Sequence, residues 1–412
     1  MKKPELLAPA GDPEKLKTTL HYGADAVYLG LSEFSLRAKA DNFTPEGLSE
    51  AVRFIHDKGK KVYVTINIFP HNRDIALIKE HLTLLKEVSP DGVILSDVGM
   101  FEMASEALPD IPIHISTQAN ITNYRAAGFW ERLGAKRLVL SRELTIEEIK
   151  DIRDKVSLEL ECFVHGAICI SYSGRCYISS FLANRPANRG ECTNSCRWNY
   201  TLMEEKRQGE YTPVYENDRG TYLLSSKDLC MIEHLDELAD AGIDSFKIEG
   251  RMKGVNYVAG VVKTYREAVD SLEKRPFKVR EEWLRELAMF SNRGYTTGMF
   301  CGRQPDNAYN HDEEEGYRMS HELVGIVESV NYGHGLVALR NLLKAGDKIE
   351  FLSSGLENRL FEVREINDQK GNPVESGRNE ERVIISLPKG VRENDLIRRP
   401  VRASSLLHSQ TD

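Results

Sequence analysis

Residues 45–67 read PEGLSEAVRFIHDKGKKVYVTIN, and this stretch contains the repeating unit on which the fold depends. Pro45–Lys58 has the spacing of an amphipathic helix, and Lys61–Asn67 is a β-rich run typical of a strand. The same alternation of strand and helix continues through the first 270 residues. It predicts a parallel sheet, because a helix then lies in each connection between neighbouring strands.

Eight strand candidates occur in this part of the chain, and a count of eight favours closure into a (β/α)8 barrel. Helical stretches lie between them, for example Pro13–Tyr22 and Thr145–Lys155, the second opened by a Thr and a Glu as in a capping box. An open, doubly wound sheet is the alternative. The candidates are Leu6–Ala8, Ala26–Gly30, Lys61–Asn67, Gly92–Ser96, Pro112–Ser116, Arg137–Ser141, Ser157–Phe163 and Asp244–Glu249.

The rest of the chain has a different pattern. We expect the barrel to occupy residues 1–275, and residues 276–320 to form a short helix and a turn-rich linker. Residues 321–412 contain short alternating strands separated by Gly/Asn turns, which predicts a small C-terminal β-barrel domain.

Composition limits the class of protein. Of the 412 residues 41% are hydrophobic and 29% charged, as in ordinary globular proteins. The N-terminal MKKPELLAPAGDP lacks the apolar core of a signal peptide, and no apolar stretch is long enough to span a membrane. We therefore expect a soluble cytoplasmic enzyme. The net charge of −8 argues against general nucleic-acid binding but leaves room for a local basic patch.

Five of the seven cysteines fall in or beside one long connection, residues 165–230, between the seventh strand and a helix expected to start near Asp228. Insertions after a barrel strand lie at the C-terminal face, where barrel active sites are found. Thiolates suit either zinc or an iron–sulfur cluster, and the spacing leaves both open, with free buried thiols as a third alternative. The five are Cys169, Cys176, Cys192, Cys196 and Cys230; Cys196 is an alternative to Cys192 as a ligand. We expect Cys162 and Cys301 to be packing residues.

The same connection reverses the local charge. Residues 175–198 carry four arginines against one acid, Glu191. Arginine suits carboxylate or phosphate recognition through its planar fork, so these side chains are candidates for an anionic substrate or an RNA backbone. Ordinary surface arginines are the alternative. The four are Arg175, Arg185, Arg189 and Arg197.

Alternating side chains on the predicted strands place polar groups on one face. Because the apolar faces must meet the surrounding helices, the polar faces would point into the barrel lumen. Such a lumen is either a hydrogen-bonded buried network or a substrate cavity, and for the whole set we favour the cavity. The residues concerned are Glu159 and Glu161, Lys247 and Glu249, His114, Ser116 and Gln118, and Tyr63, Thr65 and Asn67.

Glu161–Ser179 reads ECFVHGAICISYSGRCYIS, which resembles the signature of the collagenase-like peptidase family. Further stretches of the same kind are LLAPAGDPEKL, SLRAKADNFT, SSKDLC and SFKIEGRMK, so the resemblance covers nearly the whole chain. It implies a [4Fe–4S] cluster on four cysteines, which here are Cys169, Cys176, Cys192 and Cys230.

Length and domain order resemble most the branch of this family that takes part in oxygen-independent hydroxylation of the wobble uridine of tRNA to 5-hydroxyuridine, with prephenate required. Related branches hydroxylate a ribosomal RNA cytidine or act in ubiquinone synthesis, and the peptidase label comes from collagen-degrading relatives. The resemblance thus implies tRNA (the anticodon loop, with a base extruded) and prephenate as partners, and leaves room for a partner subunit.

Candidate roles follow from these observations. The catalytic candidates are Glu161, His165, Lys247, Glu249 and Arg251. The substrate-binding candidates are Arg175, Arg185, Arg189, Arg197, Gln118 and Asn67. A peptidase is the first rival and a non-catalytic scaffold the second. The chain lacks an HExxH helix and a GxSxG elbow, and Cys169, four residues from His165, is better employed as a cluster ligand than as a nucleophile.

Overall fold

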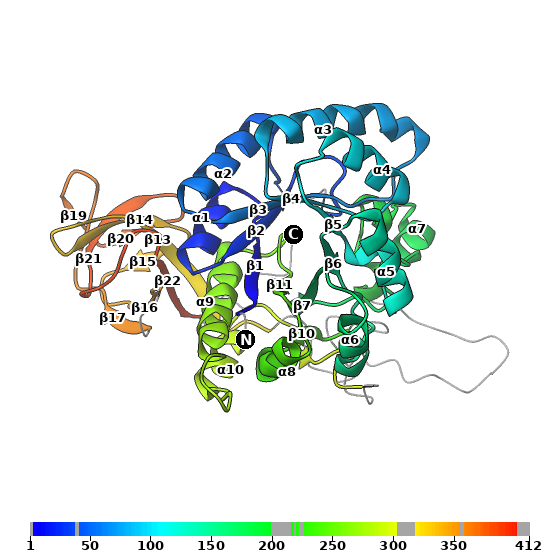
Figure 1. Ribbon diagram of the computed structural model, residues 1–412. Helices are drawn as coiled ribbons and strands as arrows, with labels where there is room; N and C mark the ends of the chain where they lie inside the picture. Colours follow the sequence, from blue (N-terminus) through cyan, green and yellow to red (C-terminus); the bar gives the residue numbers. More distant parts are fainter. Residues whose placement is uncertain are drawn as a thin grey trace, which may run out of the picture.

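The computed structural model describes residues 3–37, 41–198, 216–217, 220–221, 226–302, 318–354 and 358–401. Its first part is a closed barrel of eight parallel strands (Figure 1), because β11 pairs with both β1 and β7. The predicted barrel is therefore confirmed, and the doubly wound alternative is wrong. The strands are β1 (Glu5–Pro9), β2 (Ala26–Gly30), β3 (Lys61–Ile66), β4 (Gly92–Leu95), β5 (Ile113–Ile115), β6 (Arg137–Val139), β7 (Glu159–Ala167) and β11 (Ser245–Ile248).

Helices surround these strands (Figure 1). The capping box predicted for α6 is present: the Thr145 hydroxyl accepts from the Glu148 N–H at 3.2 Å, and the Glu148 carboxylate accepts from the Thr145 N–H at 2.8 Å. The helices are α1 (Pro13–His21), α2 (Pro45–Asp57), α3 (Ile75–Val88), α4 (Val98–Ala107), α5 (Tyr124–Leu133), α6 (Ile146–Arg153), α8 (Leu235–Asp240) and α9 (Val255–Ser271). Among the described residues, no helix has the length and apolar character to cross a membrane.

Strand alternation divides the barrel's apolar residues into two groups. Val64 and Phe246 belong to the large core that packs against the helices. Tyr28 and Tyr63 belong to a small separate cluster with three other apolar residues. The remaining inward-facing positions are largely polar, as the strand patterns predicted, and the lumen can therefore hold charged groups.

The connection after β7 is built differently from the expectation. Asp228–Cys230 is not the start of a helix but a strand, β10, antiparallel to β7, and the helix α8 begins at Leu235. β12 (Tyr295–Thr296) extends the sheet beyond β10. The insert also contains the short helix α7 (Ile178–Ala183) and the hairpin strands β8 (Glu216–Asn217) and β9 (Gly220–Thr221).

The insert is fixed to the barrel at defined points. The Arg189 guanidinium donates to the Asp74 carboxylate at 2.7 Å and to the Phe69 carbonyl at 3.0 Å. Gly174 has a φ of +73°, and a Cβ there would lie 2.1 Å from the Gln118 carbonyl oxygen. Only glycine allows so close an approach, so this turn packs directly against the end of β5.

Beyond α10 (Glu281–Ala288), the expected second unit of β-structure is present as a separate antiparallel sheet. Its described strands pair in the order β17-β16-β22-β13-β14-β21-β18-β19. Tyr22 at the end of α1 joins it to the barrel, donating to the Leu352 carbonyl and accepting from the Leu396 N–H. The strands are β13 (His321–Asn331), β14 (His334–Leu339), β16 (Lys348–Leu352), β17 (Arg359–Glu362), β18 (Ile366–Asn367), β19 (Pro373–Val374), β21 (Arg382–Ser386) and β22 (Leu396–Pro400), and a separate pair β15 (Leu343–Lys344) and β20 (Ser376–Gly377).

Candidate functional site

The ends of the barrel strands and the cysteine-rich insert enclose a cavity of about 480 Å³. This volume lies within the range of sites for small molecules. Its position at the C-terminal face is where barrel enzymes carry their active sites. Its lining includes Tyr28, Arg37, Thr65, Asn67, Ser116, Gln118, Arg142, Glu143, Cys169, Tyr172, Cys176, Cys192, Cys196, Arg197, Lys247, Glu249 and Arg251.

Below the cavity, the N-terminal half of the lumen is filled by a network of ion pairs. The Glu161 carboxylate accepts from the Lys247 ammonium at 2.7 Å and from the Arg137 guanidinium at 3.0 Å, and all three side chains are buried. Burial alone would raise the pKa of Glu161, but the two cations outweigh it and hold the pKa at about 2. Glu161 is therefore ionised and fully paired, and only Lys247 of this trio reaches the cavity wall.

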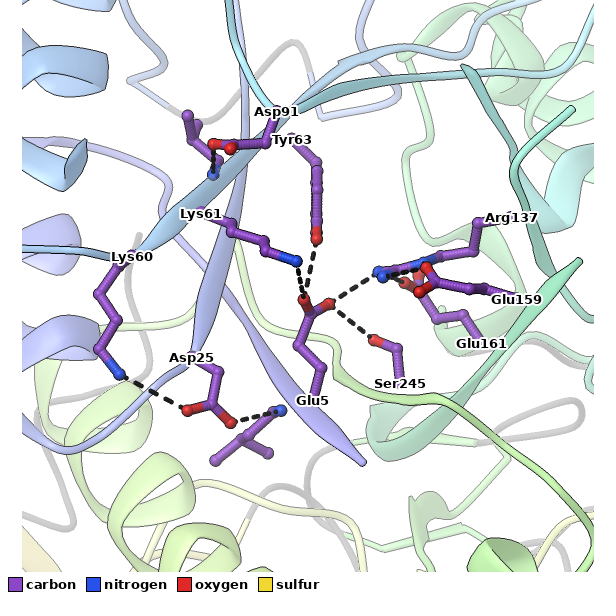
Figure 2. Close-up of polar contacts among 12 residues, drawn as sticks. Glu5, Asp25, Lys60, Lys61, Tyr63, Asp91, Arg137, Glu159, Glu161 and Ser245 are labelled. Carbon is purple, nitrogen blue, oxygen red and sulfur yellow. Dashed lines mark hydrogen bonds and ion pairs between the residues drawn. The ribbon is translucent and has the colours of Figure 1, made fainter. Parts of the chain in front are cut away.

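Figure 2 shows how this network continues to the bottom of the barrel. Glu5 lies at its centre and accepts from Arg137 at 2.7 Å, from the Tyr63 hydroxyl at 2.8 Å and from the Ser245 hydroxyl at 3.2 Å. Arg137 also donates to Glu159 at 2.7 Å. These groups saturate one another, so the lower lumen is a structural plug, and the predicted cavity occupies the upper lumen alone.

A second group of charges lines the cavity itself. The Glu249 carboxylate lies 3.2 Å from the Arg37 guanidinium and 3.8 Å from that of Arg142. Burial would raise the pKa of Glu249, but Arg37, Arg142 and Arg251 together lower it, so Glu249 is ionised. Among the described lining residues, five carry positive charge and two are acidic. The cavity therefore favours an anionic ligand.

Two of these arginines are held in place by other contacts. Arg142 donates to the Ala167 carbonyl at 2.6 Å and lies over the Phe163 ring, 4.0 Å from its centroid. Arg251 donates to the Thr65 hydroxyl at 3.0 Å and also to Ser35. Burial lowers the pKa of Arg251 to about 10, which still leaves it protonated at neutral pH. Fixed guanidinium groups of this kind bind a carboxylate with little loss of side-chain entropy.

The structure brings three of the four predicted cysteine ligands together. Cys169, Cys176 and Cys192 line the cavity, and so does Cys196. Cys230 does not belong to the described lining: its Sγ lies 3.7 Å from the Tyr265 hydroxyl, and burial raises its thiol pKa to about 11.

The Cys192 sulfur has several hydrogen-bond partners. It accepts from the Asn194 N–H at 3.4 Å and from the Ser179 hydroxyl at 3.9 Å. Hydrogen bonds to sulfur are a feature of iron–sulfur ligands. Four thiols that line one cavity have the donor chemistry of a soft-metal group, so in chemical type the residues present fit an iron–sulfur cluster. The described residues do not hold three such side chains in an arrangement ready for a single metal ion.

The remaining predicted residues have diverse positions. Gln118, Asn67 and Arg197 line the cavity. Arg175 and Arg185 are in the insert outside the described lining, and Arg189 pairs with Asp74. His165 belongs to β7 and is buried, with its ring 5.3 Å from that of Tyr265, and burial lowers its pKa to about 3.

Two arginines that line the cavity, Arg37 and Arg142, were not predicted from the sequence. Arg142 follows directly after the sixth predicted strand, at the barrel end where functional side chains collect, and this position was an available signal. Arg37 lies within the family-like stretch SLRAKADNFT but belongs to an irregular connection after β2, where no periodicity indicates the direction of a side chain.

Comparisons with known proteins agree with this architecture. The model of peptidase family U32 matches residues 11–310, and that of the peptidase family U32 C-terminal domain matches residues 319–398. The chain is 39% identical to tRNA hydroxylation protein P1 of Bacillus subtilis over 403 residues, covering 97% of this chain and 95% of the relative.

Two further relatives carry different names. The chain is 36% identical to tRNA hydroxylation protein P of Escherichia coli over 418 residues, covering 91% of each chain. It is 35% identical to a collagenase of Porphyromonas gingivalis over 314 residues, covering 73% of this chain and 74% of the relative. Relatives with these names indicate an enzyme. Because the family models match both the barrel and the C-terminal sheet, the chain belongs to peptidase family U32.

Proposed function

We propose that this protein hydroxylates the 5-position of the wobble uridine of tRNA, with a [4Fe–4S] cluster and with prephenate as co-substrate. Relatives named as tRNA hydroxylation proteins match over nearly the full chain. The observation that carries the proposal is the cavity at the C-terminal face, which combines thiols, fixed cations and four side-chain amides in about 480 Å³. A volume of this size suits one extruded base or one small acid, but not a folded RNA or a polypeptide.

The amides and cations have distinct uses in this proposal. Asn67 and Gln118 each offer a donor and an acceptor, which is what recognition of a base edge requires. Arg37, Arg142 and Arg251 would bind the carboxylates of a small dicarboxylic acid. Hydroxylation replaces C5–H by C5–OH, a two-electron oxidation, and therefore needs an electron acceptor near the base.

The oxygen atom would come from water or from a small-molecule donor, and a cluster would pass the two electrons one at a time to an external electron acceptor. Cys169, Cys176 and Cys192 would hold the cluster with a fourth thiolate. The family resemblance implies a cluster, whereas thiolate chemistry by itself also permits zinc. Metal and sulfide analysis of anaerobically purified protein distinguishes the two.

Two cysteines compete to be the fourth ligand. The family resemblance implies Cys230, which would have to turn away from Tyr265 to reach the cavity. The cavity lining supports Cys196. Iron analysis of Cys196→Ala and Cys230→Ala separates them, because the variant that removes a ligand loses iron as Cys169→Ala does, whereas the other retains it.

A peptidase is the second candidate, favoured by the similarity to a collagenase. A cysteine peptidase requires a histidine beside its nucleophile. None of the described residues that line the cavity is a histidine, and the His165 side chain packs against Tyr257 and Tyr265. The hydroxylase proposal therefore accounts for more of the site.

The deciding experiment is mass spectrometry of tRNA nucleosides from a strain that lacks the gene. We expect 5-hydroxyuridine and its derivatives to disappear and to return with the wild-type gene but not with Cys169→Ala. Unchanged nucleosides in a strain without a second enzyme of this type would overturn the proposal, and degradation of unfolded collagen by the purified chain would favour the peptidase.

A further inference from the structure

The outer surface of the insert carries a group of exposed aromatic rings. Tyr172, Tyr177 and Phe181 are 62%, 71% and 79% exposed. Single exposed apolar side chains are normal on protein surfaces, but three large rings within ten residues are not. Because these rings are exposed to water, they contribute little hydrophobic stabilisation to the fold. Their grouping therefore indicates a binding surface.

Backbone hydrogen bonds place the three residues in two successive turns of the chain. The Phe181 N–H donates to the Tyr177 carbonyl at 3.0 Å, so these residues are one helical turn apart and present their side chains on the same face of α7. The Arg175 N–H donates to the Tyr172 carbonyl at 2.9 Å, which closes the turn between Tyr172 and α7. Tyr172 also lines the cavity, so the row of rings begins at the cavity mouth.

The charges around the rings select the kind of partner. Arg175 is exposed between Tyr172 and Tyr177, and Arg185 is half-buried just beyond Phe181. Of the other two arginines of the insert, Arg189 pairs with Asp74 and Arg197 lines the cavity. Exposed rings combined with arginines are the arrangement that binds single-stranded nucleic acid, because bases stack on the rings while cations hold the phosphates.

We propose that Tyr172, Tyr177 and Phe181 form a stacking surface for the unpaired bases next to the one that enters the cavity. This inference rests on the proposed function, in that the substrate is an RNA loop, and adds where the loop binds. Stacking tolerates any base, because every base has a π-face. The surface would therefore hold the loop without selecting its sequence, and selection would occur inside the cavity.

The test measures binding of the full chain to two fluorescent RNAs at one salt concentration: a hairpin with an unpaired loop, and the same stem as a continuous duplex. We expect Tyr177→Ala and Phe181→Ala each to weaken hairpin binding about ten-fold, with duplex binding unchanged. Phe181→Trp should retain affinity. The matched control is Tyr332→Ala, which removes a ring that is 97% exposed between β13 and β14, in the C-terminal sheet on the side of the barrel away from α7 (Figure 1).

The outcomes separate this inference from the proposed function. If the wild-type chain does not prefer the hairpin to the duplex, the RNA substrate itself fails, and the inference with it. If the wild-type chain prefers the hairpin and both alanine variants bind it equally well, the stacking surface alone is wrong. If a variant instead has a different oligomeric state from the wild type in analytical ultracentrifugation, the rings belong to a contact between protein chains and the inference is overturned. Because Phe181 is 79% exposed, its replacement should leave the melting temperature unchanged.

Discussion

The Lys247 ammonium lies 2.7 Å from the Glu161 carboxylate at the floor of the cavity, and both side chains are at most 4% exposed. Arg137 contacts the same carboxylate at 3.0 Å. We expect Glu161→Gln to lower the free energy of unfolding by about 3 kcal/mol, because it leaves two buried cations without their counter-charge. Urea denaturation at neutral pH measures this change.

The same pair predicts how stability depends on pH. The pKa of Glu161 is held at about 2 in the fold, below its ordinary value of 4.5. Its contribution is therefore fully present above pH 4.5 and is lost as the pH falls towards 2. The control is Glu328→Gln, which breaks an exposed pair with Arg382 and should leave the free energy of unfolding almost unchanged, because solvent screens a surface pair. A Glu161→Gln protein as stable as the wild type across this range would show that the network adds nothing.

A second prediction concerns the junction between barrel and C-terminal sheet. The Tyr22 hydroxyl donates to the Leu352 carbonyl at 2.5 Å and accepts from the Leu396 N–H at 3.0 Å. Tyr22→Phe leaves both backbone groups buried without these partners, and we expect a loss of about 1–3 kcal/mol in the free energy of unfolding.

Limited proteolysis provides a second measurement for Tyr22→Phe. The sheet should be released from the barrel more readily in this variant, and cleavage after α10 should be faster. Tyr332→Phe removes a hydroxyl at a position that is 97% exposed and should change neither measurement. Equal stability of the two variants would mean that other contacts, such as Arg398 with Glu286 at 2.5 Å, hold the sheet in place.

The sequence was sufficient to predict the barrel, because its signals are local. Val62, Val64 and Ile66 alternate with Tyr63 and Thr65, and this period of two places apolar groups against the helices whatever the neighbouring strand is. The strand β10 was missed because its signal is not local. Asp228–Cys230 becomes a strand by pairing with β7, sixty residues earlier in the chain, and nothing in three residues indicates such a partner.

The site was predictable in part for the same reason. Asn67, Gln118 and Lys247 follow from alternation on single strands, and the structure places all three on the cavity wall. The choice of partner depends on several strands at once. Glu161 faces the lumen as Lys247 does, yet it lies deeper and is paired with Arg137. The sequence of β7 alone cannot show where Arg137 lies on β6.

A third prediction concerns the thiols on the cavity wall. Cys169→Ala should reduce bound iron and sulfide to near zero after anaerobic purification and abolish the visible absorption of the protein, because three thiolates hold a cluster poorly. Cys301→Ala is the control, since Cys301 is an exposed cysteine outside the described cavity lining. Wild-type protein that binds zinc and no iron would contradict the cluster, and unchanged iron in Cys169→Ala would remove this residue from the ligand set.

The last prediction concerns the cations of the cavity. Arg142→Met should weaken binding of prephenate about ten-fold or more, because it removes a charged donor that the Ala167 carbonyl and the Phe163 ring hold in position. Isothermal titration measures the dissociation constant. Arg142→Lys keeps the charge but loses the planar fork, and we expect an intermediate value. Arg382→Met, in an exposed pair with Glu328, should bind like the wild type. Equal binding by Arg142→Met and the wild type would show that prephenate binds elsewhere. A carboxylate in contact with this guanidinium would bind more weakly after the guanidinium is removed.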